Sequence, residues 1–176
     1  YCLNPQALTT HGLWKRLSPE ALYNEISRDD LYFRATAGGV TFGGGEPLLS
    51  YQQILHFHKL CKTNGNLWKI NLETSLNVPT DMVKVLEHIV DHWIVDIKDM
   101  NSSIKSKYTG MPESSLASLN LLKGNGIIQN VTVKVPHIPE YNTDKDVAKS
   151  IEQIKGLGFK DIVECQYIKF NGNNKK

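Results

Sequence analysis

The sequence predicts an α/β fold in which parallel strands form an open, partial barrel with helices on its outer face. Two observations lead to this fold class. Short β-rich segments alternate with helical segments along the chain, which is typical of βαβ units and a parallel sheet. Within the strands, apolar and polar residues alternate, so one face of the sheet is apolar and the other carries charge.

The helices are predicted from capping residues followed by apolar residues at helical spacing. The first begins at Ser18-Pro19-Glu20, where a capping Ser precedes a Pro and an acidic residue. The others are expected after Ser50, after Pro79-Thr80, from Ser115 to Lys123, and from Lys145 to Lys155.

The strands are expected at Val40–Phe42, Lys69–Glu73, Trp93–Lys98, Asn130–Val135 and Asp161–Gln166. In the last four, one parity is apolar: Ile70, Leu72, Val95, Ile97, Val131, Val133, Val135, Val163 and Cys165. The other parity is polar: Asn71, Glu73, Asp96, Lys98, Thr132, Lys134, Glu164 and Gln166. Because successive side chains of a strand point to opposite faces, the apolar set should meet the helices.

The polar face should line a wet or ligand-filled space, since buried unpaired charges cost several kcal/mol. A closed eight-stranded barrel fills its interior with branched apolar side chains, so an open barrel with a ligand inside fits better. Glu73, Asp96, Lys98 and Lys134 lie at or near the C-terminal ends of their strands, where α/β barrels carry their chemistry. The alternative is that they form salt bridges on a solvent-exposed sheet face.

The composition restricts the class of protein. The chain has 176 residues, enough for one domain, which we place at residues 1–170 with a polar tail at 171–176. A net charge of +2 is too small to indicate nucleic acid or a membrane as the partner. Three cysteines argue against a disulfide framework and favour a cytoplasmic protein. Because the chain begins at Tyr1-Cys2 without a Met, we expect it to be a piece of a longer protein.

The most specific segment is glycine-rich and runs from Gly38 to Leu48 with the sequence GGVTFGGGEPL. Glycines let a ligand approach the backbone closely, and Glu46 can accept a hydrogen bond from an ammonium group. A phosphate loop is disfavoured, because the GxxxxGK[ST] pattern is missing and a carboxylate would repel a phosphate. The alternative is an ordinary strand-to-helix turn.

Together with Tyr1-Cys2-Leu3-Asn4-Pro5 upstream, this segment resembles the radical S-adenosylmethionine (SAM) family that activates glycyl radical enzymes, typified by pyruvate formate-lyase activating enzyme. The resemblance continues through Leu72-Glu73-Thr74-Ser75, the sequence VDIKDM at Val95 to Met100, Tyr108-Thr109-Gly110, and the sequence KVPHIP at Lys134 to Pro139. It implies an open partial (β/α)6 TIM-like barrel of the radical SAM type, with the first strand and most of the cluster loop missing.

The resemblance also implies the cofactors and the reaction. Cys2 would be a ligand of a [4Fe-4S] cluster, Tyr1 would lie near the adenine of SAM, and Asn4 near its methionine moiety. The reduced cluster would cleave the SAM sulfonium, and the resulting 5′-deoxyadenosyl radical would abstract a hydrogen from a glycine of the partner. The implied partners are a glycyl radical enzyme and a flavodoxin- or ferredoxin-like electron donor.

Further SAM contacts follow from the same resemblance. Gly44, Gly45 and Glu46 would hold the SAM ammonium. Glu73, Asp96 and Lys98 would surround the ribose or a nearby monovalent cation, and Lys134 takes a position often held by Arg.

Departures from the family pattern restrict these expectations. The first two cluster cysteines are missing from this chain, so we expect the chain by itself to be inactive and to lack both the cluster and SAM. Leu3, Gly43, Glu140 and Tyr167-Ile168-Lys169 also differ from the family pattern. Two alternatives stay open: a radical SAM enzyme acting on another peptide or small molecule, and a non-catalytic fragment that docks a partner.

The remaining candidates have structural interpretations. Cys61 and Cys165 are expected in the core, because each shares the parity or helix face of apolar neighbours. His88 and His92 are spaced for a helical metal pair but have no third ligand, so zinc is not expected. His137 is expected at the surface, in a loop near the barrel mouth.

Overall fold

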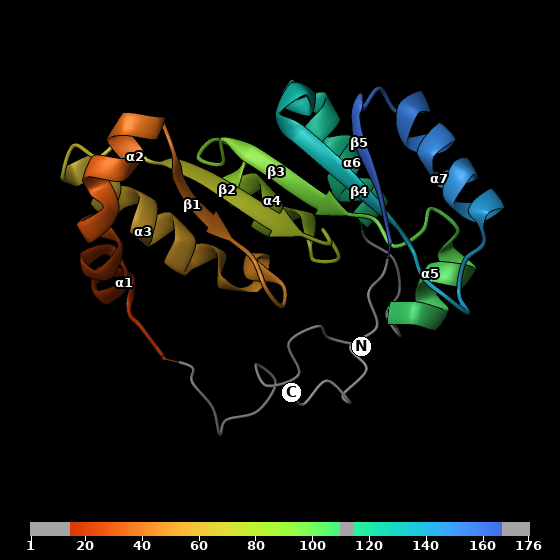
Figure 1. Cartoon of the computed structure of the whole chain (residues 1–176), viewed down its shortest axis with the longest axis horizontal. Coiled ribbons are helices and arrows are strands. Elements are labelled where there is room, and N and C mark those ends of the chain that lie inside the picture. Colours follow the sequence, from red (N-terminus) through yellow and green to blue (C-terminus); the bar gives the residue numbers. More distant parts are fainter. Residues whose placement is uncertain (1–14, 110–114, 167–176) are drawn as a thin grey trace, which may run out of the picture.

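The computed structural model describes residues 15–109 and 115–166, and it centres on a five-stranded sheet (Figure 1). The strands lie in the order β1 (Gly39–Phe42), β2 (Lys69–Thr74), β3 (His92–Asp96), β4 (Val131–His137) and β5 (Asp161–Gln166). All neighbouring strands pair in parallel. Within the described residues β1 and β5 form the two free edges, so the α/β class and the open parallel sheet predicted from the sequence are confirmed.

Helices connect successive strands, as the alternation of segments predicts. The major connections are α3 (Tyr51–Thr63), α4 (Thr80–Leu86), α6 (Ser115–Gly124) and α7 (Asp144–Gly156). Shorter elements are α1 (Pro19–Ile26), η2 (Ser27–Asp29), α2 (Asp30–Thr36), η3 (Pro47–Ser50), α5 (Ser102–Thr109) and η4 (Ile128–Asn130). Among the described residues, none of these helices has the length and apolar character needed to cross a membrane.

Two of the α-helices, α2 and α5, were not predicted. Helix α2 buries none of its residues, and in α5 the buried residue is Lys105. Helix α1 also buries none of its residues, but its Leu22 and Ile26 lie one turn apart and follow a capping Ser, and these are the features on which its prediction rests. The predicted start at Ser18 is confirmed, because its hydroxyl accepts a hydrogen bond from the Ala21 N–H at 3.2 Å.

The core lies on the apolar face of the sheet, beneath α3, α4, α6 and α7. Strands β2, β3 and β4 alternate between buried and partly exposed residues. Because the strands are in register, equivalent parities lie side by side, as with Leu72 beside Trp93 and Val95 beside Val133. Burying each such side chain contributes about 1.5–3 kcal/mol, so this face holds the sheet together and leaves the other face available for polar groups.

Strand β5 corrects the sequence prediction, because its two faces are reversed. Glu164 lies beside Val135 on the helix-facing side, whereas Val163 lies beside Lys134 on the polar side. The alternation of residues along the strand predicts that Val163 and Cys165 belong to the apolar set. This prediction is wrong because β5 is an edge strand with exposed or partly exposed residues throughout, so burial did not select which of its faces is apolar.

Candidate functional site

The charged residues that the sequence singles out gather on the polar face, at the C-terminal ends of the central strands. Lys134 Nζ of β4 lies 2.7 Å from Glu73 Oε1 of β2, reaching across β3. Lys98 Nζ lies 2.5 Å from Asp96 Oδ2, and Asp96 is the register partner of Lys134. We call these four residues the polar-face cluster. Their side chains are 23–42% exposed, so they are both paired and reachable from solvent.

One oxygen of the polar-face cluster is left over by this pairing. Asp96 Oδ1 is buried and has no hydrogen-bond partner among the described residues. Buried polar atoms are normally satisfied, and one that is not marks a place where a donor is missing. A ligand hydroxyl or a cation fits such an acceptor.

The glycine-rich turn after β1 lies beside this cluster. A Cβ atom built on Gly43 would be 3.5 Å from Glu73 Oε2, so Gly43 lies next to the Glu73 side chain. Gly44 and Gly45 have φ of +77° and +59°, a left-handed conformation that costs other residues about 1–2 kcal/mol. Among the residues that the structure describes, no atom lies within 4 Å of a Cβ built on either of them. Within the described part of the chain, the space beside these two glycines is therefore open, which leaves room for the ligand expected from the sequence.

Glu46, which the sequence predicts to accept a hydrogen bond from a ligand ammonium, is surrounded by hydrogen-bond donors of the chain itself. Its Oε1 accepts from Thr74 Oγ1 at 2.6 Å and from the Leu48 N–H at 3.2 Å. Its Oε2 accepts from the Ser75 N–H at 3.0 Å and from Ser75 Oγ at 2.7 Å. Glu46 also caps η3. Ser50 is at the N-cap position of the next helix, α3, as expected, but its side chain makes no capping hydrogen bond.

Cys165 lies on the polar side of β5, near the polar-face cluster, a position that sequence reasoning missed. Burial raises the pKa of its thiol, the charge of Asp96 raises it further, and Lys134 and Lys98 oppose this effect. In the strand register Cys165 pairs with Pro136, so it lies on the polar side of the sheet rather than among the helix-facing core residues. The register of β5 is the signal that could have found it, and an edge strand does not disclose its register in sequence.

The remaining candidates lie elsewhere. Cys61 is confirmed in the core, where burial raises its pKa to about 11.

His88 is 83% exposed, and His92 lies on β3 with its Nε2 2.8 Å from Thr132 Oγ1, so the two histidines do not share a helix. The described residues contain no group of three or more His, Cys, Asp or Glu arranged to hold a metal. Tyr1, Cys2 and Asn4 lie outside the described residues.

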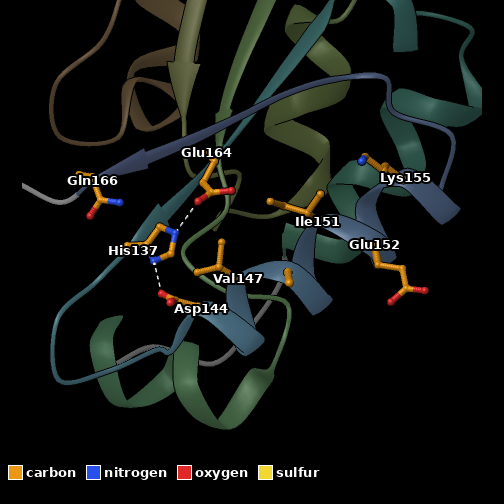
Figure 2. A pocket seen from close by; sticks show the side chains of 9 residues that line it. His137, Asp144, Val147, Ile151, Glu152, Lys155, Glu164 and Gln166 are labelled. Carbon is orange, nitrogen blue, oxygen red and sulfur yellow. Dashed lines mark hydrogen bonds and ion pairs between the residues drawn. The ribbon is translucent and has the colours of Figure 1, made fainter.

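His137 ends β4 on the helix-facing side, which corrects the expected loop position. Its Nε2 lies 2.6 Å from Glu164 Oε1 and its Nδ1 3.3 Å from Asp144 Oδ1 (Figure 2). These contacts border a cavity of about 780 Å³ between α7 and β5, with Val147 and Ile151 among its lining residues. The cavity is on the opposite face of the sheet from the polar-face cluster, so His137 is not part of the candidate site.

Comparison with known proteins gives a consistent result. The sequence pattern of the radical SAM superfamily matches residues 1–154. The chain is 35% identical to the (2S)-3-sulfopropanediol dehydratase activating enzyme of Klebsiella oxytoca over 75% of its own length and 41% of the relative's. It is 27% identical to the pyruvate formate-lyase 2-activating enzyme of Escherichia coli, over 94% of this chain and 60% of that one. The chain thus spans about 41–60% of these relatives.

Solved structures support the fold. A domain of a pyruvate-formate lyase-activating enzyme from Bacteroides vulgatus matches with a TM-score of 0.51 and 18% identity, covering 72% of this chain and 98% of that one. Coproporphyrinogen III oxidase from Escherichia coli matches with a TM-score of 0.59 and 17% identity, covering 89% of this chain and 39% of that one.

Proposed function

Because the chain belongs to the radical SAM superfamily, we propose that it acts as an activating enzyme, which cleaves SAM reductively and abstracts a hydrogen atom from a glycine of a partner glycyl radical enzyme. The observation that carries the proposal is the polar-face cluster beside the open glycine turn. The similarity of the chain to enzymes that activate a sulfopropanediol dehydratase and pyruvate formate-lyase supports this choice of partner.

The residues present fit SAM. The open backbone at Gly44 and Gly45 suits the methionine end of the ligand, whose ammonium needs carbonyl or carboxylate acceptors. The unsatisfied Asp96 Oδ1 suits a ribose hydroxyl or a monovalent cation. Lys98 and Lys134 keep the carboxylates of Asp96 and Glu73 in place by ion pairing. Cys2 would ligate the [4Fe-4S] cluster, with Tyr1 near the adenine and Asn4 near the methionine moiety.

The bound cluster and SAM supply the electron and the hydrogen-abstracting radical, and the protein supplies position and the exclusion of water. A flavodoxin- or ferredoxin-like protein would deliver the electron. A reducing, cytoplasmic setting fits Cys61 and Cys165, which are free thiols in the described part of the chain.

The test uses the product of the complete reading frame, reconstituted anaerobically with iron and sulfide. With a reductant, it should form 5′-deoxyadenosine from SAM and produce a glycyl radical signal by electron paramagnetic resonance in a glycyl radical protein encoded nearby. Cleavage of SAM without that signal would favour another peptide or small-molecule substrate. An absence of SAM cleavage would leave a partner-docking role and defeat the enzymatic proposal.

A further inference from the structure

The carboxylate of Glu46 is fully used by the chain itself. A carboxylate has about four lone-pair directions, and Glu46 accepts hydrogen bonds from Thr74 Oγ1, the Ser75 N–H, Ser75 Oγ and the Leu48 N–H. A ligand ammonium could bind this carboxylate only by displacing one of these donors. The geometry therefore disfavours Glu46 as a direct ligand contact.

The same hydrogen bonds connect two strand ends that are far apart in sequence. Glu46 follows the glycine turn after β1, whereas Thr74 ends β2 and Ser75 comes next, directly after Glu73 of the polar-face cluster. Thr74 is 2% exposed, so its hydroxyl has little access to water as an alternative partner.

The hydroxyls on the β2 side also hold a strained backbone. Thr74 Oγ1 accepts from the Leu76 N–H at 2.9 Å, and Ser75 Oγ lies 3.3 Å from the Asn77 N–H that donates to it. Leu76 has a φ of +55°, which is unfavourable for a branched side chain, and it is fully buried. A local structure of this kind persists only when surrounding contacts determine it, and Glu46 is at the centre of those contacts.

We infer that Glu46 is a positioning residue, which fixes the glycine turn against the end of β2 and acts on a bound ligand only through that turn. The inference rests on the proposed function for the identity of the ligand, but its structural part does not require one. Glu46 thus couples the turn at Gly43–Gly45, which follows β1, to Glu73 near the end of β2.

The two possible roles of Glu46 predict opposite effects of Ser75→Ala and Thr74→Val. If Glu46 contacts the ammonium directly, removing a competing donor frees its carboxylate and leaves binding equal or tighter. If Glu46 is a positioning residue, removing either hydroxyl loosens the turn and weakens binding, as Glu46→Gln does. Gln keeps one accepting oxygen but places an amide NH₂ group opposite some of the present donors.

The first readout is amide hydrogen exchange, which needs no ligand. Ser75→Ala and Thr74→Val, both on the β2 side, should speed the exchange of the Leu48 N–H on the β1 side at least tenfold, and Glu46→Gln should do the same. Thr41→Val is the matched control, because the Thr41 hydroxyl lies on β1 and is 3.4 Å from Asn71 Nδ2, away from Glu46. Unchanged exchange at Leu48 in the folded variants would overturn the inference.

The second readout is the affinity of the full-length protein for S-adenosylhomocysteine, measured by calorimetry. Ser75→Ala and Glu46→Gln should each weaken binding about tenfold, and the double variant should be no weaker than either single one. Additive losses, or tighter binding by Ser75→Ala, would overturn the positioning role. If the variants alter exchange at Leu48 but the protein does not bind S-adenosylhomocysteine, the structural coupling of the glycine turn to the end of β2 would be upheld and the proposed ligand rejected. If Thr74→Val fails to fold, Ser75→Ala carries both readouts, since it removes a partly exposed hydroxyl.

Discussion

The ion pair between Glu73 and Lys134 lies partly in solvent, with side chains 42% and 35% exposed. Exposed pairs contribute about 0–1 kcal/mol to stability, so Lys134→Gln should leave the free energy of unfolding nearly unchanged. It should still weaken S-adenosylhomocysteine binding about tenfold, because the Glu73 carboxylate would lose the ion pair that holds it in place in the site. Urea unfolding and calorimetry measure the two effects.

The matched control for this variant is Lys69→Gln. Lys69 Nζ lies 2.9 Å from Asp91 Oδ1 in a similarly exposed pair, and Lys69 begins β2 at the opposite end of the strand from Glu73. It should affect neither measurement. Equal loss of affinity in both variants would indicate a general charge effect and remove Lys134 from the site.

Residue identity in the polar-face cluster could be predicted from sequence, whereas the environment of Glu46 could not. Glu73, Asp96 and Lys134 follow from parity, because in buried central strands each position has one permitted face. The partners of Glu46 at the end of β2, Thr74 and Ser75, lie 28 and 29 residues away, and nothing local in a GGE segment indicates them. Hydrogen bonds between loops depend on how the strand ends meet, which alternation alone does not encode.

At the scale of the element, helix α7 begins with a capping box between Thr143 and Asp146. Thr143→Ala should lower the free energy of unfolding by about 1 kcal/mol at neutral pH. The Thr143 hydroxyl and N–H hold the pKa of Asp146 below its usual value of 3.8. The contribution of Asp146 is therefore present above that value and is lost as the pH falls through the lowered pKa.

The variant should therefore lose less stability than the wild type when the pH falls from 7 to about 3. Urea unfolding at both values measures this difference. Thr63→Ala, at an exposed position in the last turn of α3, is the control and should keep the wild-type pH dependence. An equal loss of stability on acidification in the wild type and in Thr143→Ala would show that the capping box does not contribute to the pH dependence of stability.

Strand β5 shows where prediction of elements reaches its limit. Its existence and approximate bounds could be predicted from its β-rich composition, but which of its side chains face the helices could not. The central strands are sandwiched between two neighbours, so a shift by one residue would bury Glu73 or Lys134 among the helices. In β5, Glu164 instead remains partly in solvent and pairs with His137, so either facing is tolerated.

At the scale of the whole molecule, the two faces of the sheet differ: one packs against the helices and stabilises the fold, and the other carries the candidate site. The helix-facing side holds the large apolar side chains, including the fully buried Leu72, Trp93 and Val133. The other side holds charged groups that are paired but reachable. Because the sheet is open between β1 and β5 within the described residues, the polar side need not be filled with apolar residues as in a closed barrel.

Adjacent residues of one strand test this difference between the two faces. Leu72 is fully buried, so Leu72→Ala should lower the free energy of unfolding by about 2–5 kcal/mol. Its neighbour Asn71 lies on the polar side, with its Nδ2 3.4 Å from Thr41 Oγ1, and Asn71→Ala should cost about 0.5 kcal/mol or less. Urea unfolding of both variants gives the comparison. Because the two positions share a strand and its local propensities, similar losses would contradict a sheet with one structural face and one face available for chemistry.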